Sequence, residues 1–580
     1  MIRTIQLSRS ELLRNLRSRV GVRGTTLPVR SSSTKSGPKV YARPAYPADE
    51  EWTTKHFIIL GGAVFFSFEV GRRFFGKPPK DINEGTSVSP LTSLKAPVYA
   101  DISTAIKAFN ELEDLLGSEN VSRADDVISS HADSAWISHH AEPGQKPGLV
   151  IFPSSTEQVS KVMEICHKYR VPVVPFSGGT SLEGHFIQTR HGVTIDFRNM
   201  GKILELHEND LDVVVQPAVR WEDLNEQLSS HGLFFPPDPG PGAEIGGMIG
   251  TGCSGTNAAR YGTMRDWVLN LTVVLADGSV IKTRRRPRKS SAGYNLTNLI
   301  IGSEGTLGIV TEATLKLAVL PEQTSVAVAT FPTINDATNS VEELVKRGIQ
   351  IAAVELLDKD MMACINAAGD TSRSWSEEPT LFFKFGGSKN AVKEQINQAK
   401  KIVNSNNSSS FKFAKNEAES EELWEARKQA LWSTLASGGE GMTCWTTDVA
   451  VPVSRLSEIV SQTRADMDAS NIPGTIVGHV GDGNFHAFIL YNDETKSVAE
   501  GVVHRLVERA IAMDGTCTGE HGVGMVKRPY LETELDTATV DTMRRLKIAL
   551  DPYRLLNADK VRLVWRIKVQ RKYIGSTNKL

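Results

Sequence analysis

The stretch PFSGGTSLEGH, residues 175–185, follows an apolar β-strand pattern, VPVV, at residues 171–174. Its consecutive small residues allow backbone N–H groups to approach a ligand closely, and a cluster of such groups binds phosphate oxygens. The loop fits neither the GxGxxG dinucleotide fingerprint nor a Walker loop ending in GK[ST]. It therefore indicates a phosphate-containing ligand, although one such loop alone is also compatible with an ordinary turn.

The surrounding sequence repeats this combination of apolar strand and small-residue loop. A strand, helix and strand are expected between 147 and 174, with Ser155 or Thr156 as the helix cap. Two more stretches, 236–280 and 299–317, join Gly/Ser/Thr loops to Val/Ile/Leu strands. Several loops around one long polar cofactor explain this pattern better than several unrelated turns.

Four motifs occur in order: Pro153–Glu157, residues 175–185, GGMIGTGCSGTNAARYGTMRD at 246–266 and GSEGTLGIVTE at 302–312. Together they resemble the FAD-binding domain of the vanillyl-alcohol oxidase/PCMH flavoprotein family over residues 145–320. The resemblance implies an α+β, two-subdomain, PCMH-type domain with FAD between its subdomains. Some relatives carry a flavin-linked histidine where Thr180 stands here, so FAD is expected to be non-covalent. His185 receives no role.

The resemblance also implies which residues contact the cofactor. The expected set is Ser177, Gly178, Gly179, Thr180, Ser181, Gly246, Gly247, Thr251, Gly252, Ser254, Asn257, Tyr261, Gly262, Gly305, Thr306, Gly308 and Ile309.

The stretch GHVGDGNFH, residues 478–486, places two histidines on either side of an Asp-Gly pair. A two-residue turn at Asp482 and Gly483 would set His479 directly opposite His486 on one face of a hairpin. That spacing suits two imidazoles on one divalent ion, but a hydrogen-bonded surface pair remains an alternative. GTCTGEHGVG, 515–524, offers Glu520 and His521 as a further ligand, and two histidines with a carboxylate suit zinc, manganese or iron.

GHVGDGNFH and GEHG, with WTTDVAVP at 445–452 and LDPYRLLNADK at 550–560, resemble the metal-dependent branch of the FAD-linked D-2-hydroxy-acid dehydrogenases. The resemblance extends from 145 to about 565, closest to its mitochondrial, cytochrome-c-reducing members. It implies that D-lactate is oxidised to pyruvate by hydride transfer from C2 to FAD, with cytochrome c as electron acceptor. The implied site roles are metal ligands His479, His486 and Glu520; catalytic base or oxyanion contact His521; and substrate-carboxylate clamp Arg427. Zinc is the first choice of metal because it does not compete with the flavin for electrons.

Two positions bear on the substrate. Relatives that oxidise D-2-hydroxyglutarate carry a lysine where Thr446 stands and an asparagine where Phe488 stands, so a smaller substrate is favoured here. Two alternatives remain open. One is a related dehydrogenase for D-2-hydroxyglutarate or glycolate, and the other is a non-catalytic flavin electron-transfer subunit of a membrane complex.

The charge of the chain is distributed unevenly. Residues 1–48 hold ten Lys and Arg residues and one acidic residue, Glu11, which leaves a net charge of about −10 for the rest. The basic, Ser-rich leader is typical of a mitochondrial presequence. The apolar run FIILGGAVFFSF at 57–68 predicts a short anchor or sorting segment at the inner membrane, with the body in the intermembrane space. The acidic body argues against nucleic acid as a partner.

The whole chain is thus expected to be α+β, with an antiparallel sheet in an α+β cap domain. The expected divisions are presequence 1–48, anchor or sorting segment 57–75, linker and N-terminal helices 76–142, FAD-binding domain 143–320, substrate and metal cap 321–550, and a C-terminal segment 551–580 that returns to the FAD domain.

Overall fold

The computed structural model describes residues 91, 94–134 and 136–561. The predicted presequence, the anchor segment 57–75 and residues 562–580 lie outside the described residues. Within the described part, no helix is both long enough and apolar enough to cross a membrane.

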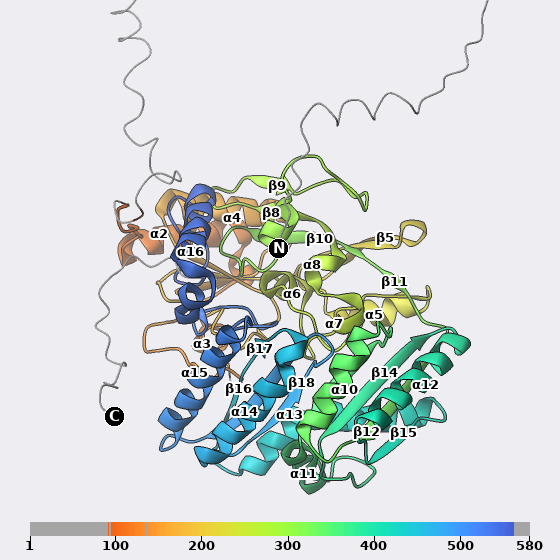
Figure 1. Cartoon of the computed structure of the whole chain (residues 1–580). Coiled ribbons are helices and arrows are strands. Elements are labelled where there is room, and N and C mark those ends of the chain that lie inside the picture. The colour runs from red at the N-terminus through yellow and green to blue at the C-terminus, as the bar shows by residue number, and fades with distance from the viewer. Residues whose placement is uncertain (1–90, 92–93, 135, 562–580) are drawn as a thin grey trace, which may run out of the picture. The chain divides into compact units, whose positions relative to one another are not determined.

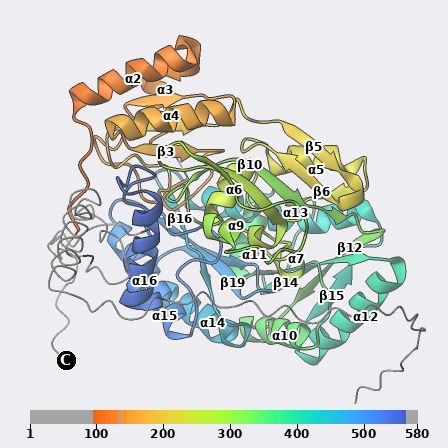
Figure 2. The same cartoon turned by 90° about the horizontal axis from the view of Figure 1, so that it is seen from above.

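A four-stranded sheet forms the first layer of the N-terminal half (Figure 1). Its order is β1 (Val121–Ser122), β2 (Leu149–Ile151), β4 (Val193–Asp196) and β3 (Val173–Phe176). The pairings of β4 with β2 and with β3 are parallel, so the chain needs crossover connections: a helix joins β2 to β3, whereas residues 177–192 join β3 to β4 without a helix. Helices α2 (Ile102–Leu116) and α4 (Thr156–Tyr169) lie side by side on this sheet (Figure 2).

Helix α4 shows why the local sequence folds this way. Its first turn is capped by Ser155, whose side chain accepts a hydrogen bond from the backbone N–H of Gln158. One face of the helix is apolar, fully buried and packed on the strands; it consists of Val159, Val162, Met163 and Cys166. The expected helix and its cap are therefore confirmed, and strand β3 delivers the chain directly into the glycine-rich loop after Phe176.

A five-stranded antiparallel sheet forms the second subdomain. Its order is β5 (Ile203–His207), β6 (Asp212–Val215), β10 (Ile309–Lys316), β8 (Val268–Val274) and β9 (Val280–Lys282). Packed with it are α5 (Trp221–Ser229), α6 (Ile245–Thr251), α8 (Met264–Trp267) and α9 (Leu296–Ile300). Helix α7 (Ala258–Tyr261) and a two-stranded sheet, β7 (Leu233–Phe234) with β11 (Ala318–Val319), complete this part. The two sheets match the expected two-subdomain fold.

The cap is built on one antiparallel sheet, as predicted. Its order is β15 (Ser410–Phe413), β12 (Gln323–Thr330), β14 (Thr380–Gly387), β13 (Ala353–Leu357), β18 (Gly474–Gly478), β19 (Asn484–Tyr491) and β16 (Thr443–Thr446), with β17 (Val449–Ala450) paired to β19. Both faces are apolar and covered, so its strands are buried on both sides.

Two groups of helices cover the cap sheet. On the face seen in Figure 1 lie α10 (Ile334–Lys346), α12 (Lys389–Ser405), α14 (Leu456–Ala469) and α15 (Lys496–Ala512). On the opposite face lie α11 (Lys359–Ala368) and α13 (Glu417–Gly438). The second face carries His486 and Phe488 of β19, because alternate residues of a strand point to the same side.

The predicted hairpin register is wrong by two residues. Val477, not His479, is the partner of His486, and residues 479–483 form a wider loop instead of a two-residue turn. The loop is fixed from outside: Gly483 has a φ of +84°, and its carbonyl accepts the N–H of Val451 at 3.1 Å. A shift of two residues preserves which face each side chain occupies, so the two histidines still meet.

The chain ends by returning to the first sheet. Helix α16 (Leu531–Leu550) leads to Leu555, whose carbonyl accepts a hydrogen bond from Val173 N at 2.8 Å. The buried Lys547 ammonium donates to the carbonyls of Thr306 and Leu556. These contacts connect the segment from α16 to Leu556 with the first residue of β3 and with the loop before β10.

Candidate active site

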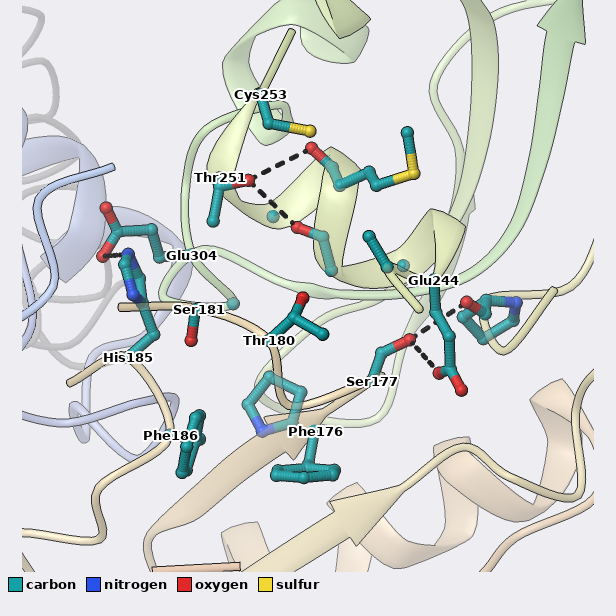
Figure 3. A pocket seen from close by; sticks show the side chains of 18 of the residues that line it. Phe176, Ser177, Thr180, Ser181, His185, Phe186, Glu244, Thr251, Cys253 and Glu304 are labelled. Carbon is teal, nitrogen blue, oxygen red and sulfur yellow. Dashed lines mark hydrogen bonds and ion pairs between the residues drawn. The ribbon is translucent and has the colours of Figure 1, made fainter. Parts of the chain in front are cut away.

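A cavity opens between the glycine-rich loops of the two FAD-type subdomains (Figure 3). Ten of the predicted cofactor residues line it: Ser177, Gly179, Thr180, Ser181, Gly246, Gly247, Thr251, Gly305, Gly308 and Ile309. Seven do not: Gly178, Gly252, Ser254, Asn257, Tyr261, Gly262 and Thr306. Ten of the predicted residues thus share one cavity, and the sequence pattern does not separate the residues that line it from those behind it.

Four of those seven residues support the neighbouring backbone instead. Ser254 donates to the carboxylate of Glu520, and Asn257 bonds the loop around Asp238 through its backbone N–H. The Tyr261 carbonyl accepts the indole N–H of Trp267 at 2.6 Å. Gly252 ends α6 with a φ of +73°. These hydrogen bonds and the left-handed backbone at Gly252 hold the segments behind the cavity wall in place.

Close packing of the loops explains the glycines. A Cβ on Gly305, whose φ is +68°, would lie 2.3 Å from Cγ of Pro175. A Cβ on Gly247 would lie 2.8 Å from the carbonyl oxygen of Ser177. The segment around Pro175 and Ser177 therefore packs directly against α6 and against the loop before β10, which brings their N–H groups around one space.

The cavity also contains buried polar atoms that require a ligand or water. Both ring nitrogens of His185 and the Oδ1 atom of Asn557 have no hydrogen-bond partner among the described residues, and both side chains line the cavity. His185 Nε2 lies 3.4 Å from the Glu304 carboxylate (Figure 3). A cofactor with a polar ring system, such as FAD, would provide partners for these atoms. The residues present thus fit FAD.

Three predicted metal ligands converge beside this cavity. His479 Nε2 lies 3.1 Å and His486 Nε2 lies 3.4 Å from Oε1 of Glu520. One ligand atom from each residue lies within 4.8 Å of those from the other two. The second oxygen of Glu520 accepts hydrogen bonds from Ser254 Oγ and Gly255 N, both at 2.8 Å. The three side chains are buried or nearly so, and this donor set fits zinc, manganese or iron.

Each imidazole is oriented by its other nitrogen. His486 Nδ1 donates to the carbonyl of Thr447 at 2.9 Å. His479 Nδ1 lies 2.9 and 3.0 Å from the two oxygens of Glu355. With Nδ1 protonated, the Nε2 lone pairs face Glu520, as a metal site requires.

The charges in the cluster are strongly coupled. Burial alone would lower the pKa of His479, but the carboxylates of Glu355 and Glu520 outweigh it and raise the pKa well above its usual range. Burial alone would raise the pKa of Glu520, yet the two histidines hold it well below its usual range. The cluster therefore holds ionised Glu520 against positive charge, which is the environment that a bound cation would occupy.

Asp448, at the end of WTTD, fixes the loop that carries Glu520. Its Oδ2 atom accepts hydrogen bonds from Thr518 Oγ1 at 2.7 Å and from the backbone N–H groups of Glu520 and His521, each at 2.9 Å. Asp448 is fully buried, and although burial opposes it, nearby His521 and Lys527 lower the pKa of its carboxyl. Both carboxylate oxygens of Asp448 are thus engaged in hydrogen bonds, two of them to the backbone of the loop, and no sequence pattern predicts this role.

His521 connects the cluster with the cavity. Its ring stacks on that of His486, with centroids 5.2 Å apart and an interplanar angle of 9°. Its Nδ1 lies 3.3 Å from Glu183. Burial lowers the pKa of His521, but Asp448 and Glu183 reverse this and raise it. Because Glu520 and His521 both line the cavity, the predicted metal cluster and the predicted base lie at its wall.

Arg427, the predicted carboxylate clamp, lies on α13 above the same face of the cap sheet. Its Nε donates to Oε2 of Glu355 at 2.7 Å. Glu355, which is fully buried, was missed by the sequence reading. A signal was present: Glu355 is the one charged residue in the apolar run IAAVELL at 351–357, and a buried charge needs a partner.

Comparison with known proteins agrees with this arrangement. Residues 147–284 match the FAD binding domain family, and residues 320–561 match the FAD linked oxidases, C-terminal domain. The mitochondrial D-lactate dehydrogenase [cytochrome] of Kluyveromyces lactis is 51% identical over 87% of this chain and 89% of its own. The mitochondrial D-lactate dehydrogenase [cytochrome] 1 of Saccharomyces cerevisiae is 47% identical over 89% of this chain and 91% of its own.

A solved structure of p-cresol methylhydroxylase with substrate bound has the same fold. It is 15% identical and has a TM-score of 0.68 over 80% of this chain and 98% of its own. That similarity supports the PCMH-type fold alone, whereas the sequence relatives identify the family. The chain belongs to the FAD-linked oxidase family that includes the mitochondrial D-lactate dehydrogenases [cytochrome].

Proposed function

We propose that this chain is an FAD-dependent dehydrogenase that oxidises D-lactate to pyruvate and passes the electrons to cytochrome c. One observation carries the proposal: the cavity that fits FAD is lined by Glu520, which belongs to the His479/His486/Glu520 cluster, and by His521, whose ring stacks on that of His486. A 2-hydroxy acid bound at the cluster would therefore lie next to the cofactor. The names of the relatives supply the substrate and acceptor.

The side chains divide the chemistry among them. His479, His486 and Glu520 would hold a divalent metal, and Arg427 would bind the substrate carboxylate through its guanidinium fork. Bound FAD supplies the hydride acceptor, and the bound metal supplies a Lewis acid that lowers the pKa of the substrate hydroxyl. His521 accepts the hydroxyl proton as the C2 hydrogen leaves with its electron pair.

His521 must be neutral to act as this base. Its pKa is raised by Asp448 and Glu183 against the effect of burial. A divalent cation on the neighbouring His486 would oppose the protonated form of His521 by like-charge repulsion. Metal loading and the availability of the base are thus linked in this proposal. Zinc is the proposed metal, because it fits the donor set and has no redox chemistry of its own.

The proposal includes the location of the protein. The basic leader, the apolar run at 57–68 and the mitochondrial relatives support a mitochondrial protein at the inner membrane, with its body in the intermembrane space. The domain division at 143–320, 321–550 and 551–580 remains part of the same proposal. Non-covalent FAD is proposed because Thr180 stands at the position of the flavin-linked histidine of some relatives.

The decisive experiment is anaerobic reduction of the purified holoprotein. D-lactate, L-lactate, glycolate and D-2-hydroxyglutarate are added separately, and loss of the visible flavin absorbance is followed. Rapid reduction by D-lactate, lost after chelation, is the expected result. Preferential reduction by glycolate or D-2-hydroxyglutarate would assign a related dehydrogenase, and no reduction by any of them would favour a non-catalytic electron-transfer subunit. Reduction of cytochrome c by the D-lactate-reduced protein tests the acceptor.

A further inference from the structure

Glu355 lies in the middle of β13 and makes contact with two predicted site residues at once. Its Oε2 accepts a hydrogen bond from Arg427 Nε at 2.7 Å. Both of its oxygens also face His479 Nδ1, at 2.9 and 3.0 Å. The side chain of Glu355 is 0% exposed, whereas that of Arg427 is 16% exposed. One buried carboxylate thus joins a predicted substrate contact on α13 to a predicted metal ligand after β18.

The Glu355 carboxylate is buried, which is costly unless its partners compensate for the lost water. A carboxylate without water is strongly disfavoured unless it is paired and hydrogen-bonded, and mutual attraction only partly offsets its desolvation. The neighbours of Glu355 on β13 are apolar and pack in the core. An apolar side chain at position 355 would pack at least as well, so packing does not explain the carboxylate. The two cationic or hydrogen-bonding partners, Arg427 and His479, are the groups that require it.

Geometry limits what each partner can do. The ion pair engages Arg427 through Nε, which leaves the two terminal nitrogens, a fork suited to a carboxylate. The bond to His479 engages Nδ1, which directs Nε2 at Glu520. If the Glu355 carboxylate were removed, the guanidinium and the imidazole would each lose the group that sets its orientation.

We infer that Glu355 is a positioning residue that sets the spacing between the substrate-carboxylate clamp Arg427 and the metal ligand His479. The inference rests on the proposed function, because it assumes a substrate that uses both groups. In a 2-hydroxy acid the carboxylate and the hydroxyl are attached to adjacent carbons, so their distance is fixed. A protein that binds the carboxylate with Arg427 and the hydroxyl at the metal must hold those two positions at a matching distance.

The test compares Glu355→Gln with the wild-type holoprotein. Glutamine keeps the size, but it has one acceptor oxygen for two donors and lacks the charge. We expect the dissociation constant for zinc, measured without substrate against a competing chelator, to rise about 10- to 100-fold, as for other carboxylate–histidine–metal contacts. At saturating zinc, we expect the KM for D-lactate to rise about tenfold and kcat to change less, because the carboxylate contact forms in both ground and transition states.

A matched control is Asp358→Asn. Asp358 is also fully buried and directly follows the same strand, but it caps α11 through Met361 N and touches neither Arg427 nor His479. The Asp358→Asn variant should therefore keep the wild-type zinc affinity and the wild-type KM for D-lactate. If Glu355→Gln is insoluble, Glu355→Asp keeps the charge but shortens the reach, and both values should still move.

Three results would overturn the inference. The first is a zinc dissociation constant and KM in Glu355→Gln both within twofold of wild type. The second is a change in only one of them, since one carboxylate is inferred to serve both groups. The third is a wild-type protein that binds no zinc, manganese or iron. Flavin reduction by D-lactate in the wild type is measured separately, so failure of the proposed function is distinguishable from failure of this inference.

Discussion

Thr446 and Phe488 lie directly opposite each other on the antiparallel strands β16 and β19. In β19, Phe488 is two residues from His486, so this pair shares a face with a predicted metal ligand. The two positions that differ from relatives acting on D-2-hydroxyglutarate are thus one cross-strand pair beside the site. Their separation in the sequence concealed this.

This pairing predicts a change of substrate preference. In the double variant Thr446→Lys/Phe488→Asn, polar groups replace a hydroxyl and a buried ring on the site face. The KM for D-2-hydroxyglutarate should fall about tenfold, the equivalent of one charge-assisted hydrogen bond, and the KM for D-lactate should rise. Steady-state kinetics with both acids measures this. Trp445→Phe, on the opposite face of β16, is the control, and equal changes in it would contradict the prediction.

Loss of a metal ligand should abolish turnover while preserving the fold. His479→Ala removes one of the three proposed ligands, so bound metal should fall and flavin reduction by D-lactate should slow at least about 1000-fold, typical of a lost Lewis acid. Metal analysis and anaerobic reduction measure the two effects. His504→Ala changes an exposed histidine on α15 and should do neither. Full activity in metal-free protein would contradict the metal site.

A pair of glycines separates cavity packing from backbone strain. Gly305 and Gly232 both have a φ of +68°, but a Cβ on Gly305 would meet Pro175 at 2.3 Å, whereas one on Gly232 would meet nothing within 4 Å. Both alanine variants should lose about 1 kcal/mol from the left-handed conformation. Only Gly305→Ala should also release FAD, measured as flavin retained after gel filtration. Equal flavin retention in the two variants would show that this close approach does not shape the cavity.

Asp448→Asn should loosen the loop that carries Glu520 and His521. The amide retains acceptor capacity on one side only, yet Asp448 accepts from three donors on Oδ2 and from Asn484 on Oδ1. Stability should fall by about 3 kcal/mol, as for a disrupted buried charged network, and kcat should fall with it. Thermal unfolding and turnover test this. Asp466→Asn, which breaks ion pairs to Arg505 and Arg509, should affect unfolding only.

Asp358 predicts a specific pH dependence of stability. Burial raises the pKa of its carboxyl from 3.8 to about 7. The folded protein therefore binds this proton more tightly than the unfolded chain, and its stability falls as the pH rises from about 4 to about 7. Asp358→Asn removes this loss, because asparagine can still cap α11. The difference in Tm between Asp358→Asn and the wild type should be more positive at pH 8 than at pH 5. The control is Asp360→Asn, which changes a more exposed carboxylate on the same helix and should give the same Tm difference at both pH values.

Much of the candidate site could be predicted from local sequence. Gly247 lies where a Cβ would clash with the backbone of Ser177, so the paired glycines in the sequence indicate a close approach of two segments. His479 and His486 were brought together correctly although the predicted register was wrong, because a two-residue shift leaves each side chain on its face. The α+β fold followed from the alternation of apolar strands and capped helices.

The tertiary structure alone decided the remaining features. The 479–483 loop takes its shape from contact with Val451, which no local turn rule contains. Segments far apart in the chain meet in the fold, such as β13 with α13 and the 516–524 loop with Asp448. These contacts place Glu355, Asp448 and His185 at the candidate site. Residue chemistry and short-range periodicity are local, so the sequence was enough to propose which residues bind FAD, a metal and a carboxylate. The buried groups that orient these residues depend on long-range packing. A buried charge is stable only when another segment of the chain supplies an ionic or hydrogen-bonding partner.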